Sequence, residues 1–373
     1  MKTRLMIGLL LLGVAERTEA ATYYVATSGL DSLTCAQAQS IDTPMGSIAG
    51  GIGCLTAGDT LLVRGGTYNE AIYNLVPSGT SWADTVRVAA YPGEVVWMSP
   101  QAGVGSGYVV AFAAAQSYIE FDGINLDASQ LEYGPLKIET WWGANPHHIR
   151  VMNAELVGNP SQGQQGIIVI NSIPGSIGAD EFINLKIHGG GTSDFDHGMY
   201  LQAPDILVDN CDIWDWPGAG IQIYNGYGIP TQNITIRNTM IRDLRATSYG
   251  QRHWGIIVGG AAADNRIYGN TIFNVPNDGG SSAAILVYEG SGTLIYNNAL
   301  YEGASAGIDL EPGSLNASVV NNVSCGHPIG DYLDYGIGTS AANNLFATSP
   351  ISCDEMRGSQ TLSMVDGASE VGR

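Results

Sequence analysis

The chain has 373 residues, of which 45% are hydrophobic and only 13% are charged, and its formal net charge is -20. This composition is sufficient for a large core and differs from that of a disordered acidic tail. The excess of acidic side chains argues against nucleic acid as a partner.

The first twenty residues have the pattern of a secretory signal peptide. Lys2 and Arg4 precede an apolar run over 6–15, and a short polar stretch ends at Ala20. This order predicts a signal peptide over 1–20 and a secreted protein, extracellular or periplasmic. The run is too short to span a bilayer, so we expect no membrane span. The remaining chain has 12 basic and 33 acidic residues, a formal charge of -21, and we expect a monomer.

Five cysteines in an exported chain favour disulfide bonds. The economical pairing joins Cys35 to Cys54 and Cys325 to Cys353, and it leaves Cys211 unpaired. Sequence alone does not prove this connectivity, and buried thiols are the alternative.

Short Ile/Val/Leu alternations and fifty glycines favour many brief strands, and these recur at a near-constant interval. One marker of the interval is an asparagine three residues before an apolar or aromatic position, with successive spacings of 31, 26, 28, 32, 28, 24 and 22. These asparagines are Asn153, Asn184, Asn210, Asn238, Asn270, Asn298, Asn322 and Asn344.

A second column of small residues runs in phase with the asparagines and opens a strand-like segment each time. It contains Gly166, Gly198, Gly220, Gly255, Ala284 and Gly307. Two strand segments per repeat, with no helical pattern between them, predict an all-β, single-stranded right-handed parallel β-helix. We expect an N-terminal cap and first coils over 21–100, coils over 101–345 and a C-terminal cap or tail over 346–373. A β-sandwich is the alternative, but it predicts tight hairpin turns at shorter spacing.

Two N-terminal stretches resemble a known group of proteins. "TYYVATSGLDS" (22–32) and "AGDTLLVRGGTYNE" (57–70) look like the opening segment of secreted β-helix polysaccharide lyases related to pectate lyase, chondroitinase B and alginate lyase. The later coils resemble the general repeat of that superfamily through about Leu345. The resemblance implies this fold and a polysaccharide substrate, and it is less specific for the reaction.

In a solenoid the strands are scaffold, and the variable loops carry function. Three long loops, over 188–197, 242–254 and 274–283, precede the glycine column and enter the same sheet edge. Polar and aromatic side chains beyond them suit a sugar, which has an apolar face and a polar rim. The expected substrate-binding residues are Lys137, Trp142, Gln222, Tyr224, Arg245, His253, Trp254 and Tyr288. Alternatively, these aromatic residues only cover strand edges.

The stretch "SDFDHGMYLQ" (193–202) carries the candidate proton-transfer groups. Elimination or epimerisation at a uronic acid requires a partner for the carboxylate, a base for the adjacent proton and a proton donor. His197 and Tyr200 can share the proton transfers, and Arg252, with Arg245 in reserve, can bind the carboxylate. "FDH" and "RHWG" resemble segments of alginate C5-epimerases, although the proline of their Asp-Pro-His run is missing and a tryptophan is inserted.

The net negative charge raises the question of a cation, because an anionic polymer would be repelled. Calcium is a candidate cofactor, with Asp194, Asp196 and Asp215 as ligands and Asp278 as a further one, although no calcium-loop motif is present. The alternative is structural: Asp194 and Asp196 bond loop amides, and His197 covers the sheet edge.

Two other functions remain open at this point. A β-helix glycoside hydrolase would use paired carboxylates such as Asp309 and Glu311. A non-catalytic glycan-binding protein or adhesin would have short, equal loops, and the unequal loops favour an enzyme. The sequence does not choose between lyase, epimerase and hydrolase.

Overall fold

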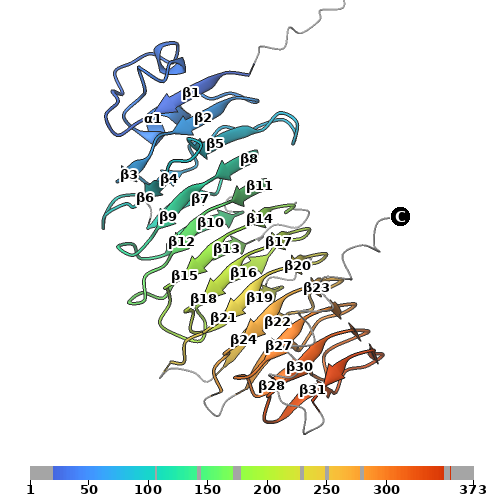
Figure 1. Ribbon diagram of the computed structural model, residues 1–373. Helices are drawn as coiled ribbons and strands as arrows, with labels where there is room; N and C mark the ends of the chain where they lie inside the picture. The colour runs from blue at the N-terminus through green and yellow to red at the C-terminus, as the bar shows by residue number, and fades with distance from the viewer. Residues whose placement is uncertain are drawn as a thin grey trace, which may run out of the picture.

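The computed structural model describes residues 20–105, 107–140, 144–170, 178–226, 231–247, 252–277 and 281–347, together with Cys353. These residues form a right-handed parallel β-helix, as predicted, in which successive coils stack along one axis (Figure 1). The expected two strand segments per repeat are wrong, because the coils contribute strands to three sheets. Among them, no helix is long and apolar enough to cross a membrane. The predicted signal peptide lies outside the described residues except for Ala20.

The three sheets contain twelve, eleven and ten strands, each paired in parallel with its neighbours. The 12-stranded sheet contains β1 (Thr22–Val25), β2 (Thr60–Val63), β5 (Val86–Ala90), β8 (Ser117–Asp122), β11 (His147–Met152), β14 (Glu181–Ile183), β17 (Leu207–Asp209), β20 (Thr235–Arg237), β23 (Arg266–Tyr268), β26 (Leu294–Tyr296), β29 (Ser318–Val320) and β32 (Ser340–Ala342). The 11-stranded sheet contains β3 (Gly66–Tyr68), β6 (Val96–Met98), β9 (Ile124–Asp127), β12 (Glu155–Val157), β15 (Lys186–His188), β18 (Asp212–Trp214), β21 (Met240–Arg242), β24 (Thr271–Phe273), β27 (Ala299–Tyr301), β30 (Val323–Cys325) and β33 (Leu345–Phe346). The 10-stranded sheet contains β4 (Ile72–Tyr73), β7 (Tyr108–Phe112), β10 (Gly134–Glu139), β13 (Ile167–Ile170), β16 (Met199–Gln202), β19 (Ala219–Tyr224), β22 (His253–Gly259), β25 (Ser282–Val287), β28 (Ala306–Leu310) and β31 (Gly330–Asp334).

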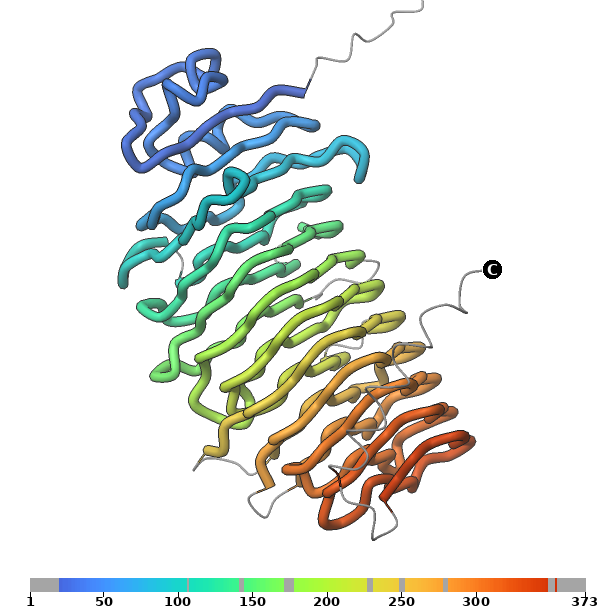
Figure 2. Tube along the Cα trace, in the orientation of Figure 1, coloured from blue at the N-terminus to red at the C-terminus, as the bar shows by residue number. Residues whose placement is uncertain are grey.

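The chain trace shows that the coils stack in the order in which they occur in the sequence (Figure 2). Alternate residues of each strand point inward, so equivalent apolar side chains stack from coil to coil. In the 10-stranded sheet one such row is fully buried and consists of Ile167, Met199, Ile221, Ile256, Ile285 and Ile308. The core is therefore a set of continuous apolar ladders, and the register fixes which residues face outward.

The glycine column lies in one register row, directly before the inward row of the 10-stranded sheet. Space explains its composition: a Cβ on Gly198 would lie 2.7 Å from the carbonyl oxygen of Gly220 and 2.5 Å from a methyl carbon of Ile213. Gly220 meets the carbonyl oxygen of Gly255 and the side chain of Ile241 in the same way. The column therefore marks positions where a side chain has no room between the next coil and an isoleucine of the 11-stranded sheet.

The single asparagine column predicted from sequence is wrong, because the structure contains two adjacent columns. Asn153, Asn184, Asn210 and Asn238 are exposed and left-handed, with φ between 51° and 56°. Asn270, Asn298 and Asn322 are instead buried one position further along, and Asn344 follows them half-buried. Gly269, at φ 66°, occupies the exposed position, which explains why the spacing to Asn270 is 32.

Each column forms a ladder of side-chain amides. In the exposed ladder, the Asn184 amide donates to Asn153 at 2.8 Å. In the buried ladder, Asn298 donates to Asn322 at 2.9 Å and accepts from the Asn270 amide at 3.0 Å. Later coils carry both columns side by side, as the Asn-Asn pairs at 297–298, 321–322 and 343–344 show.

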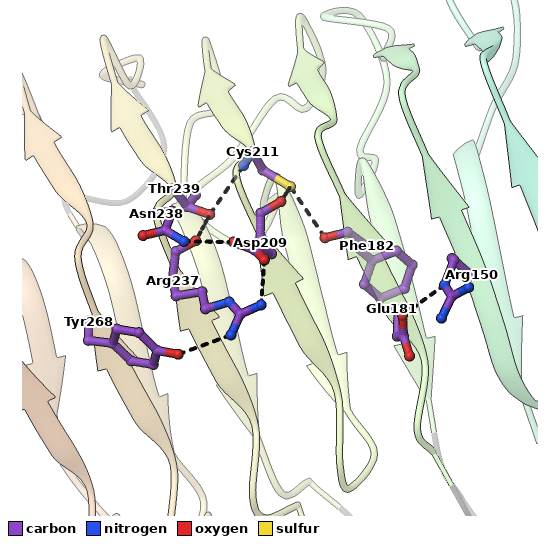
Figure 3. Close-up of polar contacts among 9 residues, drawn as sticks. All are labelled: Arg150, Glu181, Phe182, Asp209, Cys211, Arg237, Asn238, Thr239 and Tyr268. Carbon is purple, nitrogen blue, oxygen red and sulfur yellow. Dashed lines mark hydrogen bonds and ion pairs between the residues drawn. The ribbon is translucent and has the colours of Figure 1, made fainter. Parts of the chain in front are cut away.

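Figure 3 shows where these columns meet the outer face of the 12-stranded sheet. Asp209 accepts hydrogen bonds from Asn238 and Arg237, and Arg237 also donates to the Tyr268 hydroxyl. Cys211 and Thr239 occupy the position of the buried column in the earlier coils. The Cys211 backbone amide donates to the Thr239 hydroxyl at 3.3 Å. The sheet face thus carries its own network of paired charges, with arginine and carboxylate on neighbouring coils.

The predicted disulfides are present, and they secure the two ends. Cys35–Cys54 closes a loop beside α1 (Ile48–Ile52), and Cys325–Cys353 joins the last coils to the following segment. Cys211 is free and buried. Helix α1 covers the first coil, since a Cβ on its Gly51 would lie 2.5 Å from Val25 and 2.6 Å from Leu61. The short helix η1 (Gln37–Gln39) lies in the same cap.

The two asparagine ladders predict unequal effects on stability. Asn298→Ala leaves buried partners of Asn298 unpaired, including the Asn270 amide and the Ile267 carbonyl, and it should lower the free energy of unfolding by about 3 kcal/mol. Asn184→Gly keeps the left-handed backbone in an exposed position, so its cost should stay below about 1 kcal/mol. Urea denaturation of both variants measures the difference, and equal losses would contradict the two-column interpretation.

Asp180 predicts a pH-dependent stability. Burial raises the pKa of its carboxyl well above the usual value, so the folded state holds the proton more tightly and stability falls as pH rises above the unfolded pKa. Asn265 occupies the same register row and accepts the equivalent backbone hydrogen bond. Asp180→Asn should therefore stabilise the protein at pH 8 but hardly at pH 4, and Asn265→Asp should destabilise it at pH 8 only. A gain independent of pH in urea denaturation would refute this.

Candidate active site

The outer face of the 10-stranded sheet carries two parallel rows of side chains. Strand pairing places one row in register along the axis: Lys137, Ile168, Tyr200, Gln222, Ile257, Leu286 and Asp309. Two residues further along each strand lies a second row, which contains Tyr224, Gly259, Tyr288 and Glu311. The alternation of strand residues therefore gathers polar and aromatic groups from distant parts of the sequence on one surface.

One cavity of about 560 Å³ lies over the middle of these rows. Its lining comes from the loops before β16, β22 and β25 and from the outward rows: Asp194, Phe195, His197, Tyr200, Gln222, Tyr224, Arg252, Trp254, Ile257, Ser281, Leu286, Tyr288 and Glu311. The three long loops thus meet at one sheet edge, as their positions in the sequence indicate. All three predicted catalytic residues contribute to this lining, as do four of the eight predicted substrate-binding residues.

The loop before β16 is shaped by Asp196. Its carboxylate accepts hydrogen bonds from the backbone amides of Thr192 and Ser193 at 2.8 Å and 2.9 Å. Arg245 holds the same loop by donating to the carbonyl oxygens of Gly190 and Gly191 at 2.9 Å and 2.6 Å. Both side chains act as supports of the loop, and neither lines the cavity.

His197 is buried, and its protonation state follows from its contacts. Its Nδ1 accepts a hydrogen bond from the Ala219 amide at 2.8 Å, so in the neutral ring the proton lies on Nε2. Burial lowers the pKa of His197 to about 3. The ring is nearly parallel to that of Tyr200, with centroids 6.2 Å apart. At neutral pH, His197 is therefore a hydrogen-bond donor rather than a base.

Arg252 and Asp194 form an ion pair at the cavity wall. The Arg252 guanidinium lies 3.4 Å from the Asp194 carboxylate and 5.4 Å from the centre of the Phe195 ring. The arginine side chain is 55% exposed, whereas that of Asp194 is 2% exposed. Arg252 is therefore held from one side while its other side is open to a ligand.

Two buried polar atoms on lining residues lack a partner within the described part of the chain: Asp194 Oδ1 and Trp254 Nε1. An unsatisfied buried acceptor or donor costs on the order of 1–3 kcal/mol. A ligand that donates to Asp194 and accepts from Trp254 would remove that cost. Sugar hydroxyls do both, since each is a donor and an acceptor.

Aromatic side chains form the second row of the cavity. The Tyr288 ring occupies the space above Gly259, where a Cβ would lie 2.0 Å from a ring carbon. Burial raises the pKa of Tyr288, and its hydrogen bond with Tyr224 raises it further. Tyr288 therefore remains protonated, and both tyrosines lie beside an apolar floor of Ile257 and Leu286.

Several predicted binding residues lie elsewhere. Lys137 shares the row of Tyr200 but two coils away, where it pairs with Glu139 and lies 5.0 Å from the centre of the Tyr108 ring. His253 is fully buried, with Nδ1 2.7 Å from the Pro217 carbonyl oxygen, because it faces the opposite side of the strand from its neighbour Trp254. Arg245 is engaged with the loop, and Trp142 lies outside the described residues.

The three predicted calcium ligands do not converge. Asp194 pairs with Arg252, Asp196 bonds loop amides, and Asp215 accepts from Arg245 at 3.2 Å. In the described residues, no group of three or more His, Cys, Asp or Glu side chains is placed to hold a metal. The fourth suggested ligand, Asp278, is outside those residues.

Sequence reasoning missed four lining residues: Phe195, Ile257, Ser281 and Leu286. The sequence could have indicated two of them, because Gly220, Gly255 and Ala284 give the alignment of successive strands. Counting two residues beyond each of these positions reaches Gln222, Ile257 and Leu286. Ile257 and Leu286 were missed because they are apolar and the sequence was searched for polar and aromatic groups.

The chain was compared with known proteins by sequence and by structure. No protein-family model and no curated protein matches the chain. Among solved structures, it resembles pectate lyase Pel9A with a TM-score of 0.60 at 16% identity, over 90% of this chain and 82% of that one. The fold is pectate lyase-like. An alginate lyase from Paenibacillus sp. str. FPU-7 (TM-score 0.59, 14% identity, 87% and 99% covered) shares this pectate lyase-like β-helix.

A glycoside hydrolase has the same fold. The GH136 lacto-N-biosidase from Eubacterium ramulus matches with a TM-score of 0.57 at 13% identity, over 88% of this chain and 68% of that one. The pectate lyase-like β-helix therefore occurs with more than one reaction. At these identities the comparisons establish the fold, and the reaction has to be argued from the cavity.

Arg245 gives a test of the loop support. Arg245→Ala removes its bonds to two loop carbonyls and to Asp215, so amide hydrogen exchange over 189–197 should accelerate by about tenfold or more. Arg266→Ala is the matched control, because Arg266 bonds only the exposed Asn233 side chain among the contacts described. Unchanged exchange in Arg245→Ala would show that the loop holds its shape without the arginine.

Proposed function

We propose that this protein is a secreted polysaccharide lyase or C5-epimerase that acts on a uronate sugar in this cavity. The observation that carries the proposal is the convergence of Tyr200, Arg252, Gln222 and the neutral His197 on one cavity. A tyrosine hydroxyl can transfer protons, and the other three groups can donate hydrogen bonds to a carboxylate. Similarity of fold to a pectate lyase and an alginate lyase is consistent with this reaction class.

The first step is capture of the uronate carboxylate. The open side of Arg252 offers a charged fork, and Gln222 and His197 Nε2 offer neutral donors. These donors stabilise the negative charge that develops on the carboxylate when the adjacent carbon loses its proton. Because His197 stays neutral, it contributes without requiring a change of protonation.

The second step is proton transfer by Tyr200, which projects from the cavity floor between His197 and Gln222. In the lyase reaction, Tyr200 reacts as the phenolate and takes the C5 proton, the C4–O bond breaks and a C4=C5 double bond forms. The new Tyr200 hydroxyl then gives its proton to the leaving oxygen, which restores the phenolate. In the epimerase reaction the C4–O bond remains, Tyr200 passes the C5 proton to solvent, and a solvent proton returns to C5 from the opposite face.

Tyr200→Phe tests the assignment. Loss of the hydroxyl should reduce the appearance of unsaturated uronate, followed by ultraviolet absorbance, by about 100-fold or more. Epimerisation is followed as hydrogen exchange from solvent into the polymer. Tyr73→Phe is the control, since Tyr73 is exposed on β4 of the same sheet and lies outside the cavity. Full activity of Tyr200→Phe would overturn its role as the proton-transfer group.

Whether the reaction requires calcium, the candidate cofactor from the sequence, is a separate part of this proposal. The cavity contains its own cation in Arg252, so the proposed steps do not need a metal. The same assay with a chelator and with added calcium measures the requirement.

A glycoside hydrolase is the second candidate, and one observation favours it. Burial, together with the nearby charge of Glu311, raises the pKa of Asp309 to about 6. The two carboxylates are two residues apart in the sequence, about 6.6 Å between Cα atoms, and a carboxyl with a raised pKa beside a second carboxyl suits acid–base hydrolysis. New reducing ends without unsaturated uronate, abolished in Asp309→Asn, would establish this reaction instead.

A further inference from the structure

The charges along the cavity limit which polymer it can accept. Of the residues that line it, one is a cation, Arg252, and two are carboxylates, Asp194 and Glu311. Arg252 already has Asp194 as a counter-ion. The described lining therefore has no surplus positive charge, and the open side of Arg252 can receive one substrate carboxylate at most.

Among the described residues, the other cations nearest the cavity already have partners. Lys137 pairs with Glu139, and Arg245 pairs with Asp215 and the loop carbonyls. The internal segments outside the description, at 106, 141–143, 171–177, 227–230, 248–251 and 278–280, contain neither lysine nor arginine. A polymer with a carboxylate on every sugar would therefore leave most of its charges without partners in this groove.

The far end of the groove is acidic. Asp309 lies four strands from Tyr200 in the same row, about 19 Å along the axis at about 4.8 Å per strand. Glu311 projects from the same strand face and lines the cavity. Two neighbouring carboxylates there repel a third one from the substrate.

The same end suits uncharged sugars. Asp309 Oδ1 is buried without a hydrogen-bond partner among the described residues, so it can accept from a sugar hydroxyl. Between Arg252 and Glu311 the floor is apolar at Ile257 and Leu286, which fits the C–H face of a pyranose. The groove thus changes from a site for one anion to a site for neutral sugars along its length.

We propose that the substrate is a heteropolysaccharide in which one uronate binds at Arg252 and Gln222 while neutral sugars occupy the stretch from Ile257 to Glu311. This inference rests on the proposed function for the position of the uronate. It deepens that function by separating alternating or sparsely charged polymers from homopolyuronates such as pectate and alginate.

Binding, measured apart from catalysis, tests the substrate class. In the Tyr200→Phe background, with chelator and at low salt, calorimetry compares oligosaccharides of pectate and alginate with those of hyaluronan and gellan. Hyaluronan alternates glucuronate with a neutral sugar, and gellan has one glucuronate among four sugars. At least one of these heteropolymers should bind about tenfold more tightly than either homopolyuronate. Equal or tighter binding of pectate or alginate would overturn the inference.

A pair of variants tests the cause of the preference. Asp309→Asn with Glu311→Gln keeps the acceptors but removes the charges, so the affinity ratio of heteropolymer to homopolyuronate should fall about tenfold. Asp42→Asn with Glu132→Gln makes the same change in net charge at exposed positions away from the groove, and it should leave the ratio within about twofold. An unchanged ratio in the groove variant would refute the electrostatic explanation.

The two proposals fail in distinguishable ways. Preferential binding of a heteropolymer, with neither unsaturated uronate nor proton exchange in the wild type, would overturn the lyase or epimerase reaction and leave the substrate class standing. Elimination on pectate or alginate, with these polymers binding as tightly as the heteropolymers in calorimetry, would support the lyase reaction and overturn the substrate class. Binding of homopolyuronates that appears only with calcium would also overturn the inference, because a bound cation would then supply the missing charge.

Discussion

The parallel hydrogen bonding between successive coils is the constraint on which the structure depends. It keeps every strand in register with the strand one coil away, so inward side chains stack into ladders such as the row from Ile167 to Ile308. The same register decides the outer face, because alternate residues point outward. A change in one coil that shifted the register would disturb both the core and the candidate site.

Because the coils form a regular frame, the shape of the cavity depends on the loops. The loop before β16 is held by Asp196 from within and by Arg245 from a neighbouring coil. These supports place His197 against the Ala219 amide, which fixes its tautomer and keeps it neutral. The donors of the cavity are thus arranged before any ligand arrives, which favours electrostatic stabilisation of a reacting carboxylate.

Pairing of charges makes the proposed action on an acidic sugar compatible with the acidity of this protein. Outside the cavity, arginines such as Arg150 and Arg237 are matched by carboxylates on neighbouring coils (Figure 3). Arg252 differs, because it is paired on one side by a buried carboxylate and is open on the other. In the proposed function, one open cation receives one uronate, and the acidic far end of the groove would favour neutral neighbouring sugars.

The sequence by itself determined the fold, since a β-helix repeats its turn and core residues at an interval that can be counted. It also indicated that the three loops share one edge and that Tyr200, Gln222, Arg252 and Trp254 lie near one another. Only the tertiary structure decided which polar groups reach the cavity. Strand alternation turned His253 inward, and Arg245 was used to hold a loop. The two asparagine columns also required the structure, because a shift of one residue at Asn270 changes exposure without changing the repeat.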